Sequence, residues 1–243
     1  MNARLPVIEI RDLVKGAGGP APLRVRELVV DASDRTVVGG IDRPTAELLV
    51  HLITGAAVPD EGSVRVAGVD TRSIATDKEW LNSLDRFGLV SDRAVLLDSL
   101  PVAANLALPL TLAIEPMEPE TRRDVDRLAR EVALDAGALD RPMSSLSPFD
   151  RLRVHLARAL ANGPDLLLLE DPTAGLRDPA ASAAFGELLR DVSAARPVGW
   201  LGFSNDVAFT QASAGVAVSL DVHTGVVKRP RRWWPWGRTS SRG

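Results

Sequence analysis

The sequence predicts an α/β fold in which helices cover a mainly parallel β-sheet, on two observations. Short apolar runs rich in β-branched residues alternate with longer segments of helical periodicity along most of the chain. Residues 166–169, four consecutive leucines, are apolar on both faces of a strand and directly precede Glu170 and Asp171. We therefore expect a central strand whose two acids lie at its carboxyl end, where α/β folds bind their ligands.

The elements of this fold are predicted from periodicity and from helix start and stop signals. The runs expected to form strands are residues 7–10, 28–30, 37–38, 64–66, 89–90, 166–169, 198–203 and 216–220. The segments expected to form helices are residues 46–55, 119–133, 148–161, 179–194 and 206–214.

Residues 91–146 differ from the rest because prolines interrupt helical segments and no convincing strand is present. We predict a helical insertion over this stretch. The chain then divides into a core formed by residues 1–90 and 147–228, the insertion at 91–146, and a tail at 229–243 whose proline and glycine content prevents a long regular element.

Composition restricts the possible functions. The chain of 243 residues has no cysteine and three histidines far apart in sequence, which excludes thiolate chemistry and leaves no metal cluster to expect. No apolar run approaches the roughly 20 residues of a membrane-spanning helix, so we expect a soluble, cytoplasmic protein. The net charge is −3, but the last sixteen residues hold six basic residues and no acid, so the remainder carries −9. An acidic body argues against nucleic-acid binding.

Five segments, in order, resemble the ATP-binding cassette (ABC) ATPase family. Residues 40–55 (GIDRPTAELLVHLITG) resemble its phosphate loop and first helix, and residues 59–70 the strand pair that follows. Residues 97–109 resemble the start of its helical subdomain, 146–160 its signature helix, and 164–176 its Walker B strand and D-loop. A single match would be weak, but an ordered set over nearly the whole chain makes convergence improbable.

The resemblance implies a P-loop NTPase-like ABC ATPase core with a mainly parallel sheet, an N-terminal antiparallel β portion and a helical subdomain. The small chain and short helical subdomain most resemble stand-alone subunits that pair with lipid or lipoprotein transport permeases.

The phosphate-loop resemblance implies a nucleotide site whose residues are mostly substituted. Gly40 is retained, while the later glycines, the lysine and the magnesium hydroxyl align with Arg43, Thr45, Ala46 and Glu47. Glu47 places a negative charge where a triphosphate would lie, and two unit charges about 4 Å apart repel by roughly 4 kcal/mol. The alternative interpretation is a plain strand-to-helix turn in which Asp42 or Thr45 caps the helix.

Three further nucleotide positions also depart from the family pattern. The base-stacking aromatic falls at or beside Ala17, and the glutamine that senses magnesium aligns with Asp92, which is either a metal ligand or a surface acid at a strand end. In the signature, Ser147 is retained, but the glycines are replaced by Pro148 and Phe149. The segment is also typical of a helix start, with serine as N-cap and proline in the first turn.

The catalytic positions implied by the resemblance are Glu170, Asp171 and Asn205. The first two acids stand in the reverse of the usual order, so the longer one falls at the magnesium position and the shorter one at the general-base position. Asn205 replaces the switch histidine as an uncharged hydrogen-bond donor. A misplaced carboxylate impairs hydrolysis without abolishing it.

These substitutions favour a structural or regulatory pseudo-ATPase that docks on a membrane permease or a partner ATPase and needs no cofactor. The alternative is a functioning ABC transport ATPase with divergent motifs, which uses ATP and magnesium and has lipid or lipoprotein as its candidate cargo. A third arrangement, a heterodimer with an active partner, is weaker because both halves of each composite site are altered in this chain.

The tail predicts contact with an anionic membrane surface on the inner face of the cell membrane. It interleaves aromatic and basic side chains: Arg229, Arg231, Arg232, Trp233, Trp234 and Trp236. Alternatives are a disordered terminus, tryptophans that fold back onto the domain, or a contact with single-stranded nucleic acid, which the acidic body would oppose.

Overall fold

The structure, a computed structural model, describes residues 5–16 and 21–229. The position expected for the base-stacking aromatic and the tail from residue 230 onward lie outside the described residues.

The larger sheet, sheet B, is mainly parallel, as predicted. Its strand order is β10-β9-β3-β8-β7-β6, and every neighbouring pair is parallel except β9 with β10. Its strands are β3 (Arg35–Gly39), β6 (Phe87–Val90), β7 (Leu166–Glu170), β8 (Gly199–Phe203), β9 (Val216–Asp221) and β10 (Val226–Lys228). The leucine run forms β7, which lies between β6 and β8 and is buried along its whole length.

The smaller sheet, sheet A, is the antiparallel N-terminal portion that the family resemblance implied. Its order is β2-β1-β4-β5, with strands β1 (Ile8–Lys15), β2 (Leu23–Val30), β4 (Glu61–Val66) and β5 (Val69–Asp70). β1 pairs with both β2 and β4, so Ile8 lies between Val30 and Val66.

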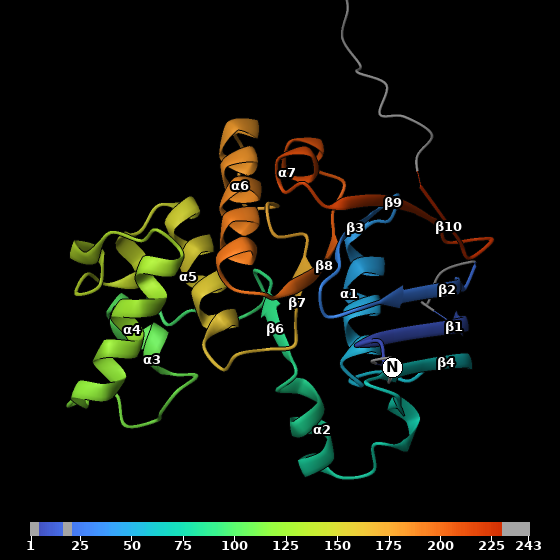
Figure 1. Cartoon of the computed structure of the whole chain (residues 1–243), viewed down its shortest axis with the longest axis horizontal. Coiled ribbons are helices and arrows are strands. Elements are labelled where there is room, and N and C mark those ends of the chain that lie inside the picture. The colour runs from blue at the N-terminus through green and yellow to red at the C-terminus, as the bar shows by residue number, and fades with distance from the viewer. Residues whose placement is uncertain (1–4, 17–20, 230–243) are drawn as a thin grey trace, which may run out of the picture.

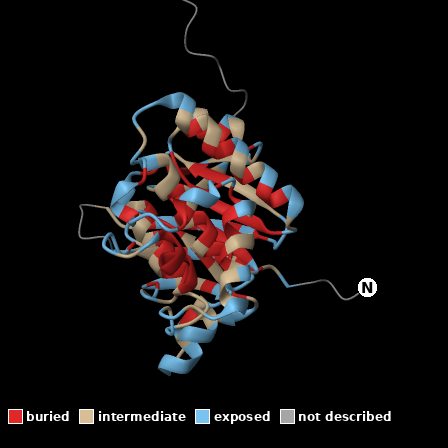
Figure 2. Cartoon of the chain, turned by 90° about the vertical axis from the view of Figure 1, so that its left-hand side faces the viewer, coloured by how far each residue is buried: buried red, intermediate tan, exposed pale blue. Residues whose placement is uncertain are grey.

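The two faces of sheet B pack into two different hydrophobic clusters because side chains alternate along a strand. Leu166 and Leu168 of β7 join α1 (Arg43–Ile53) and the inner face of sheet A. Leu167 and Leu169 pack with the helices on the opposite face. Helix α1 thus lies between the two sheets, and buried residues gather at the centre of the body (Figures 1 and 2).

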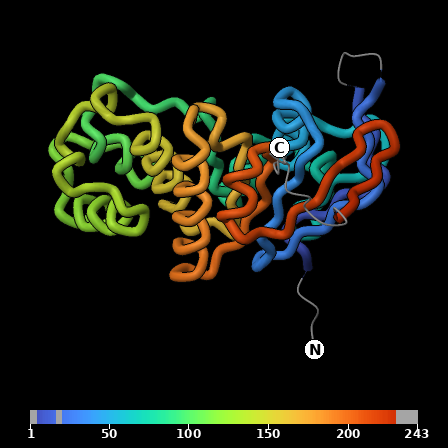
Figure 3. Tube along the Cα trace, turned by 90° about the horizontal axis from the view of Figure 1, so that it is seen from above, coloured from blue at the N-terminus to red at the C-terminus, as the bar shows by residue number. Residues whose placement is uncertain are grey.

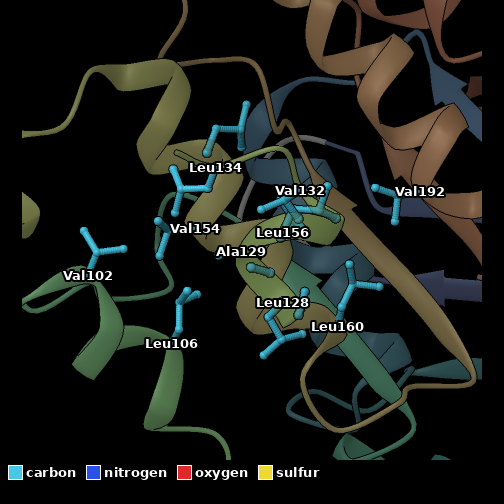
Figure 4. Packing of buried hydrophobic residues seen from close by; sticks show 14 of the residues in the cluster. Val102, Leu106, Leu128, Ala129, Val132, Leu134, Val154, Leu156, Leu160 and Val192 are labelled. Carbon is cyan, nitrogen blue, oxygen red and sulfur yellow. The ribbon is translucent and has the colours of Figure 1, made fainter. Parts of the chain in front are cut away.

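The opposite face of sheet B is covered by helices that continue into a helical end of the molecule. These are α3 (Val102–Ala107), α4 (Pro119–Glu131), α5 (Pro148–Leu160), α6 (Pro179–Ala195) and α7 (Val207–Ala212), with short 3-10 turns at Ala136–Ala138 and Met143–Ser145. Apolar side chains of α3, α4 and α5 meet in one core (Figure 4). Seen from above, these helices and sheet A lie at opposite ends (Figure 3).

Sequence reasoning missed β10, the 3-10 turn Thr71–Ser73 and α2 (Asp77–Leu84), whereas β4 and β5 are the strand pair that the family resemblance implied at residues 59–70. α2 has no buried residue, so it offers little of the apolar periodicity that identifies helices, but Thr76 and Glu79 form a complete capping box that signals its start. The described residues between β6 and β7 form helices and loops, and the division of the chain at 91 and 146 stays a prediction.

None of the helices within the described residues is both long and apolar enough to cross a membrane.

Candidate functional site

The turn between β3 and α1, where a phosphate loop is expected, is built as a capped helix start. Asp42 is the N-cap residue, and its Oδ1 accepts a hydrogen bond from the backbone N–H of Thr45 at 3.0 Å. The N–H of Ala46 donates to the carbonyl of Asp42 at 3.0 Å, and Pro44 has no N–H to offer. The interpretation of this segment as a capped strand-to-helix turn is confirmed with Asp42 rather than Thr45 as the cap, and the helix begins at Arg43, three residues before its predicted start.

The side chain of Asn205 fastens the same turn. Its Oδ1 accepts from the backbone N–H of Gly40 at 2.8 Å, and its Nδ2 donates to the carbonyl of Ile41 at 2.6 Å. Asn205 is a hydrogen-bond donor, as expected, but its amide donates within the chain to the carbonyl of Ile41. Gly40 has φ +80°, and a Cβ there would lie 2.6 Å from Ser219 Oγ, which is why this glycine is required.

Ala46 and Glu47, near the start of α1, lie in different environments. Ala46, at the lysine position, is buried with 3% of its surface exposed. Glu47 lies one residue further, and its Oε1 accepts from Nη1 of Arg93 at 2.6 Å. The repulsion expected from a bare carboxylate is thus offset by a guanidinium that the sequence analysis did not assign.

Arg93 also binds Glu170 at the end of β7. Its Nε donates to Oε1 at 2.9 Å and its Nη2 to Oε2 at 2.5 Å, a two-pronged ion pair. The Glu170 side chain is 1% exposed, so its charge is compensated by this guanidinium. Hydrogen bonding to Glu170 raises the pKa of Arg93 above its ordinary value despite partial burial. His51 Nε2 lies 3.2 Å from Arg93 Nη1.

A second arginine joins the loop after β6 to the start of α1. Nη2 of Arg43 lies 2.6 Å from Oδ1 and 2.7 Å from Oδ2 of Asp92, and this hydrogen bonding raises the pKa of Arg43. Of the two interpretations of Asp92, the structure matches the acid at a strand end, because it follows β6, is half-exposed and pairs with an arginine.

Asp171 departs from β7 in a different direction from its neighbour Glu170. Its backbone has φ +40°, a left-handed conformation rare for residues other than glycine, and its N–H donates to the carbonyl of Phe203 at 2.9 Å. Burial raises the pKa of the Asp171 carboxyl, and Arg43 partly opposes that shift. The two acids have different surroundings: Glu170 pairs with Arg93, whereas Asp171 lines a small cavity beside the β3–α1 turn.

A cavity of about 100 Å³ remains between the turn and the ends of β7 and β8. Its charged lining consists of Arg43 and three acids, Asp42, Asp171 and Asp206. Among the described residues, no group of three or more potential metal-ligating side chains has the geometry to hold a metal ion.

Ser147 is separate from this cluster and starts α5. Its Oγ accepts from the N–H of Asp150 at 3.1 Å and donates to Asp150 Oδ2 at 2.8 Å. Pro148 occupies the first helical turn, and the Arg153 guanidinium lies 4.6 Å over the Phe149 ring. The helix-start interpretation is confirmed, and none of the hydrogen bonds of Ser147 reaches the residues around Glu170.

Arg93 is the functional residue that sequence reasoning missed, and the ion pair of Arg43 was not foreseen, although Arg43 was named as a substituted phosphate-loop position. Arg93 stands one residue after Asp92, which the motif comparison had singled out. A signal was available in the sequence, because new charges of opposite sign, Glu47 and Arg43 in the loop and helix start and Asp92 and Arg93 after the strand, appear together at or beside motif positions.

Comparisons with known proteins agree with this fold. The family model described as "ABC transporter" matches residues 48–174. Among curated relatives, methionine import ATP-binding protein MetN 2 of Burkholderia mallei (strain ATCC 23344) is 38% identical over 181 residues, which are 73% of this chain and 44% of the relative. MetN 2 of Enterococcus faecalis (strain ATCC 700802 / V583) is 32% identical over 193 residues, covering 78% of this chain and 55% of the relative.

Solved structures show the same architecture. The dimeric, post-hydrolysis ATP-binding cassette MJ0796 bound to ADP and Pi superposes with a TM-score of 0.71 at 19% identity, covering 93% of this chain and 100% of that one. CbiO1 from Clostridium perfringens, part of the ABC transporter complex cbiONQ, gives a TM-score of 0.76 at 19% identity over 93% of this chain and 89% of its own.

The chain spans about half the length of the curated relatives it matches. These relatives are named for methionine import, and the expected closeness to lipid or lipoprotein transport subunits stays a prediction. A family model that covers more than half of the chain, together with the cassette fold, leads to one conclusion: this chain belongs to the ABC transporter family, as an ATP-binding subunit homologue.

Proposed function

We propose that this chain is a structural or regulatory ABC subunit that neither binds ATP at physiological concentration nor hydrolyses it. The observation that carries the proposal is the β3–α1 turn, in which the N–H groups of Gly40 and Thr45 already donate to the side chains of Asn205 and Asp42. A phosphate loop needs those groups pointing at the ligand. No ATP or magnesium is required in this role.

The size and charge of the remaining cavity support the proposal. Its volume is about 100 Å³, whereas sites for small molecules have volumes of roughly 300–1,000 Å³. Three of its charged side chains are acids, and its one base, Arg43, is engaged by Asp92. A triphosphate would enter a small space with a negative lining and no lysine at position 46.

The alternative function is an active transport ATPase. It is favoured by the curated relatives, which are named as ATP-binding proteins at up to 38% identity, and by the retention of Glu170 and Asp171 at the end of β7. Under this alternative the chain would power uptake of a small nutrient such as methionine, by analogy with those relatives, or transport of lipid or lipoprotein.

Calorimetric titration of the full chain with Mg-ATP separates the two functions. We expect no heat of binding up to millimolar nucleotide and no phosphate release above background. A methionine import ATP-binding protein, such as that of Geobacillus kaustophilus (37% identical over 145 residues), serves as the positive control under the same conditions. Micromolar, magnesium-dependent binding by this chain would support the alternative.

The partner we propose is a membrane permease, alone or with a second ABC ATPase, which would hold the chain at the inner face of the membrane. The surface we assign to it is the α2–α5 groove, about 270 Å³, lined by Leu81, Leu84, Phe87, His155 and Arg158. α2 stands away from the body, and Leu81 is 54% exposed (Figure 1).

The positive charge of Arg158 in the groove favours a partner segment that has a carboxylate next to an apolar side chain. Arg158 is partly buried, and burial lowers its pKa. Its Nη1 donates to the carbonyl of Val95 at 2.6 Å, and the groove also has one acid in its lining, Asp85. Arg158→Glu should abolish co-purification with the permease encoded nearest to this chain, whereas Arg86→Ala, which removes an exposed ion pair with Asp165, should not.

A further inference from the structure

The position of Arg93 between two carboxylates suggests a role beyond a single ion pair. Its guanidinium contacts Glu47 through Nη1 and Glu170 through Nε and Nη2, at 2.5 to 2.9 Å. The three residues come from three elements: α1, the loop after β6 and the end of β7. One positive charge thus lies between two negative ones that are far apart in sequence.

If the Arg93 guanidinium were removed, another positive charge would be needed in its place. Glu170 is 1% exposed, so without Arg93 its ionised carboxylate would be buried without compensation, in the field of Glu47. Two carboxylates that share one space either take up a proton or bind another cation. The carboxylate oxygens of Glu47 on α1 and Glu170 at the end of β7 are the kind of donors that a hard divalent cation such as Mg²⁺ or Mn²⁺ selects.

We propose that the Arg93 guanidinium is a built-in counter-cation: it fills a position that Glu47 and Glu170 would otherwise give to a divalent metal ion. The chain thereby holds the loop after β6 against α1 and β7 with neither metal nor nucleotide. The ion pair between Arg43 and Asp92, the residue before Arg93, also links the loop after β6 to α1. This inference deepens the proposed function, and it can fail separately, because metal binding by variants and nucleotide binding by the natural chain are different measurements.

The test is Mn²⁺ binding followed by electron paramagnetic resonance, in which free Mn²⁺ gives a spectrum that is lost on binding. We expect the full natural chain to leave the spectrum of free Mn²⁺ unchanged. Arg93→Ala should bind one Mn²⁺ more tightly than the natural chain by at least about tenfold. Arg93→Lys keeps a positive charge and should not bind, and Arg93→Ala with Glu170→Gln should lose the gain.

Thermal unfolding gives a second readout. The melting temperature of Arg93→Ala should fall, and Mn²⁺ or Mg²⁺ should restore part of the loss, while the natural chain should not respond to either ion. Arg86→Ala is the matched control, because it also removes an arginine from an ion pair but at an exposed site. It should neither bind Mn²⁺ nor be rescued by it.

The proposal is overturned if the natural chain binds Mn²⁺ as tightly as Arg93→Ala, or if a folded Arg93→Ala or Arg93→Gln variant does not bind it. If neither variant folds in metal-free buffer, folding in millimolar MnCl₂, followed by circular dichroism, supports the proposal. Failure to fold there, under conditions in which Arg86→Ala folds, overturns it.

Discussion

Arg93 and Glu170 face each other as a planar fork and a carboxylate, with Nε–Oε1 at 2.9 Å and Nη2–Oε2 at 2.5 Å. The carboxylate is buried at the end of the central strand β7, while about a third of the Arg93 side chain is exposed. The pair therefore places a carboxylate inside the body with Arg93 as its direct partner and Arg43 as a further positive charge nearby. Breaking the pair and removing it altogether should have different consequences.

We predict that Arg93→Met destabilises the chain by about 3 kcal/mol, at the low end for a buried charge that loses its partner, because water still reaches this arginine. The double variant Arg93→Met with Glu170→Leu should recover most of that loss, since no charge then stays buried. Guanidinium denaturation of the natural chain, both single variants and the double variant measures this coupling. Simple additivity of the two single effects would contradict the prediction.

A second prediction concerns the turn that Asn205 fastens. Asn205→Ala removes the acceptor for Gly40 N–H and the donor to the carbonyl of Ile41, so it should destabilise the chain by about 1–3 kcal/mol. The loss should appear as faster hydrogen exchange at Gly40 and the start of α1. Asn162→Ala, at an exposed position, is the control and should stay within about 0.5 kcal/mol. Equal effects of the two variants would remove Asn205 from the account of this turn.

The α/β class, the central leucine strand and the helix starts at Asp42 and Ser147 could be predicted because each depends on local chemistry. Apolar residues on both faces imply a buried strand, and a short polar residue before proline implies a helix start. α2 could not be identified from periodicity, because it buries no residue and its signal lies only in the caps.

The sequence predicts which positions form the candidate site, but not how their side chains pair. The family resemblance assigned Glu47, Asp92 and Glu170 to one site, but each was interpreted separately, as a lost hydroxyl, a metal ligand or surface acid, and a retained acid in reversed order. Their pairing with Arg43 and Arg93 depends on which strand ends are neighbours, and residues 46 positions apart in sequence give no local signal for that contact. The structure thus replaces a set of separate defects with one connected ionic cluster.

We predict that Ala46→Lys with Glu47→Ser restores only weak, millimolar binding of Mg-ATP and no hydrolysis above background. The new lysine would start from a buried position and reach a cavity of about 100 Å³ whose acids compete for it. Asn205 and Asp42 would still occupy the donors of the turn. Calorimetry and a phosphate-release assay check the two halves of this prediction, with Ala46→Lys alone as the comparison. Turnover comparable to that of an intact relative would contradict it.

Stability should fall on acidification through His155, which lines the α2–α5 groove. Burial first, and then the charges of Arg158 and Arg151, lower the pKa of His155 to about 4 from an ordinary value of 6.5. The unfolded chain therefore binds a proton more readily than the folded one between these two values. The contribution of a neutral His155 is fully present at pH 7 and is lost as the pH falls from about 6.5 to 4, by up to roughly 3 kcal/mol.

His155→Gln should flatten this part of the pH profile when urea unfolding is measured from pH 7 to pH 4. The pKa of Asp171 is raised by burial and acts in the opposite direction, favouring the folded state at low pH, but it contributes equally to both proteins and cancels in their difference. His223→Gln, at an exposed turn, is the control and should keep the natural slope. Identical profiles for His155→Gln and the natural chain would contradict the assignment.

The last prediction concerns the basic, tryptophan-rich tail, of which the structure describes only Arg229. Lys228 pairs with Ser219 in the β9–β10 hairpin, so a chain ending at Lys228 keeps that hairpin and removes the tail alone. Tryptophan favours the headgroup layer, and each arginine near an anionic leaflet contributes about 1 kcal/mol. We therefore expect the full chain to sediment with anionic vesicles at low salt and to be released by high salt, while the shortened chain stays in solution.

Replacing Trp233, Trp234 and Trp236 by alanine should weaken binding with little change in its salt dependence, and Arg231→Gln with Arg232→Gln should reduce that dependence. Equal sedimentation of the full and shortened chains would exclude the tail as the membrane contact. We expect no such result, because removal of the five arginines after Lys228 changes the net charge from −3 to −8, and an anionic surface repels the shortened chain.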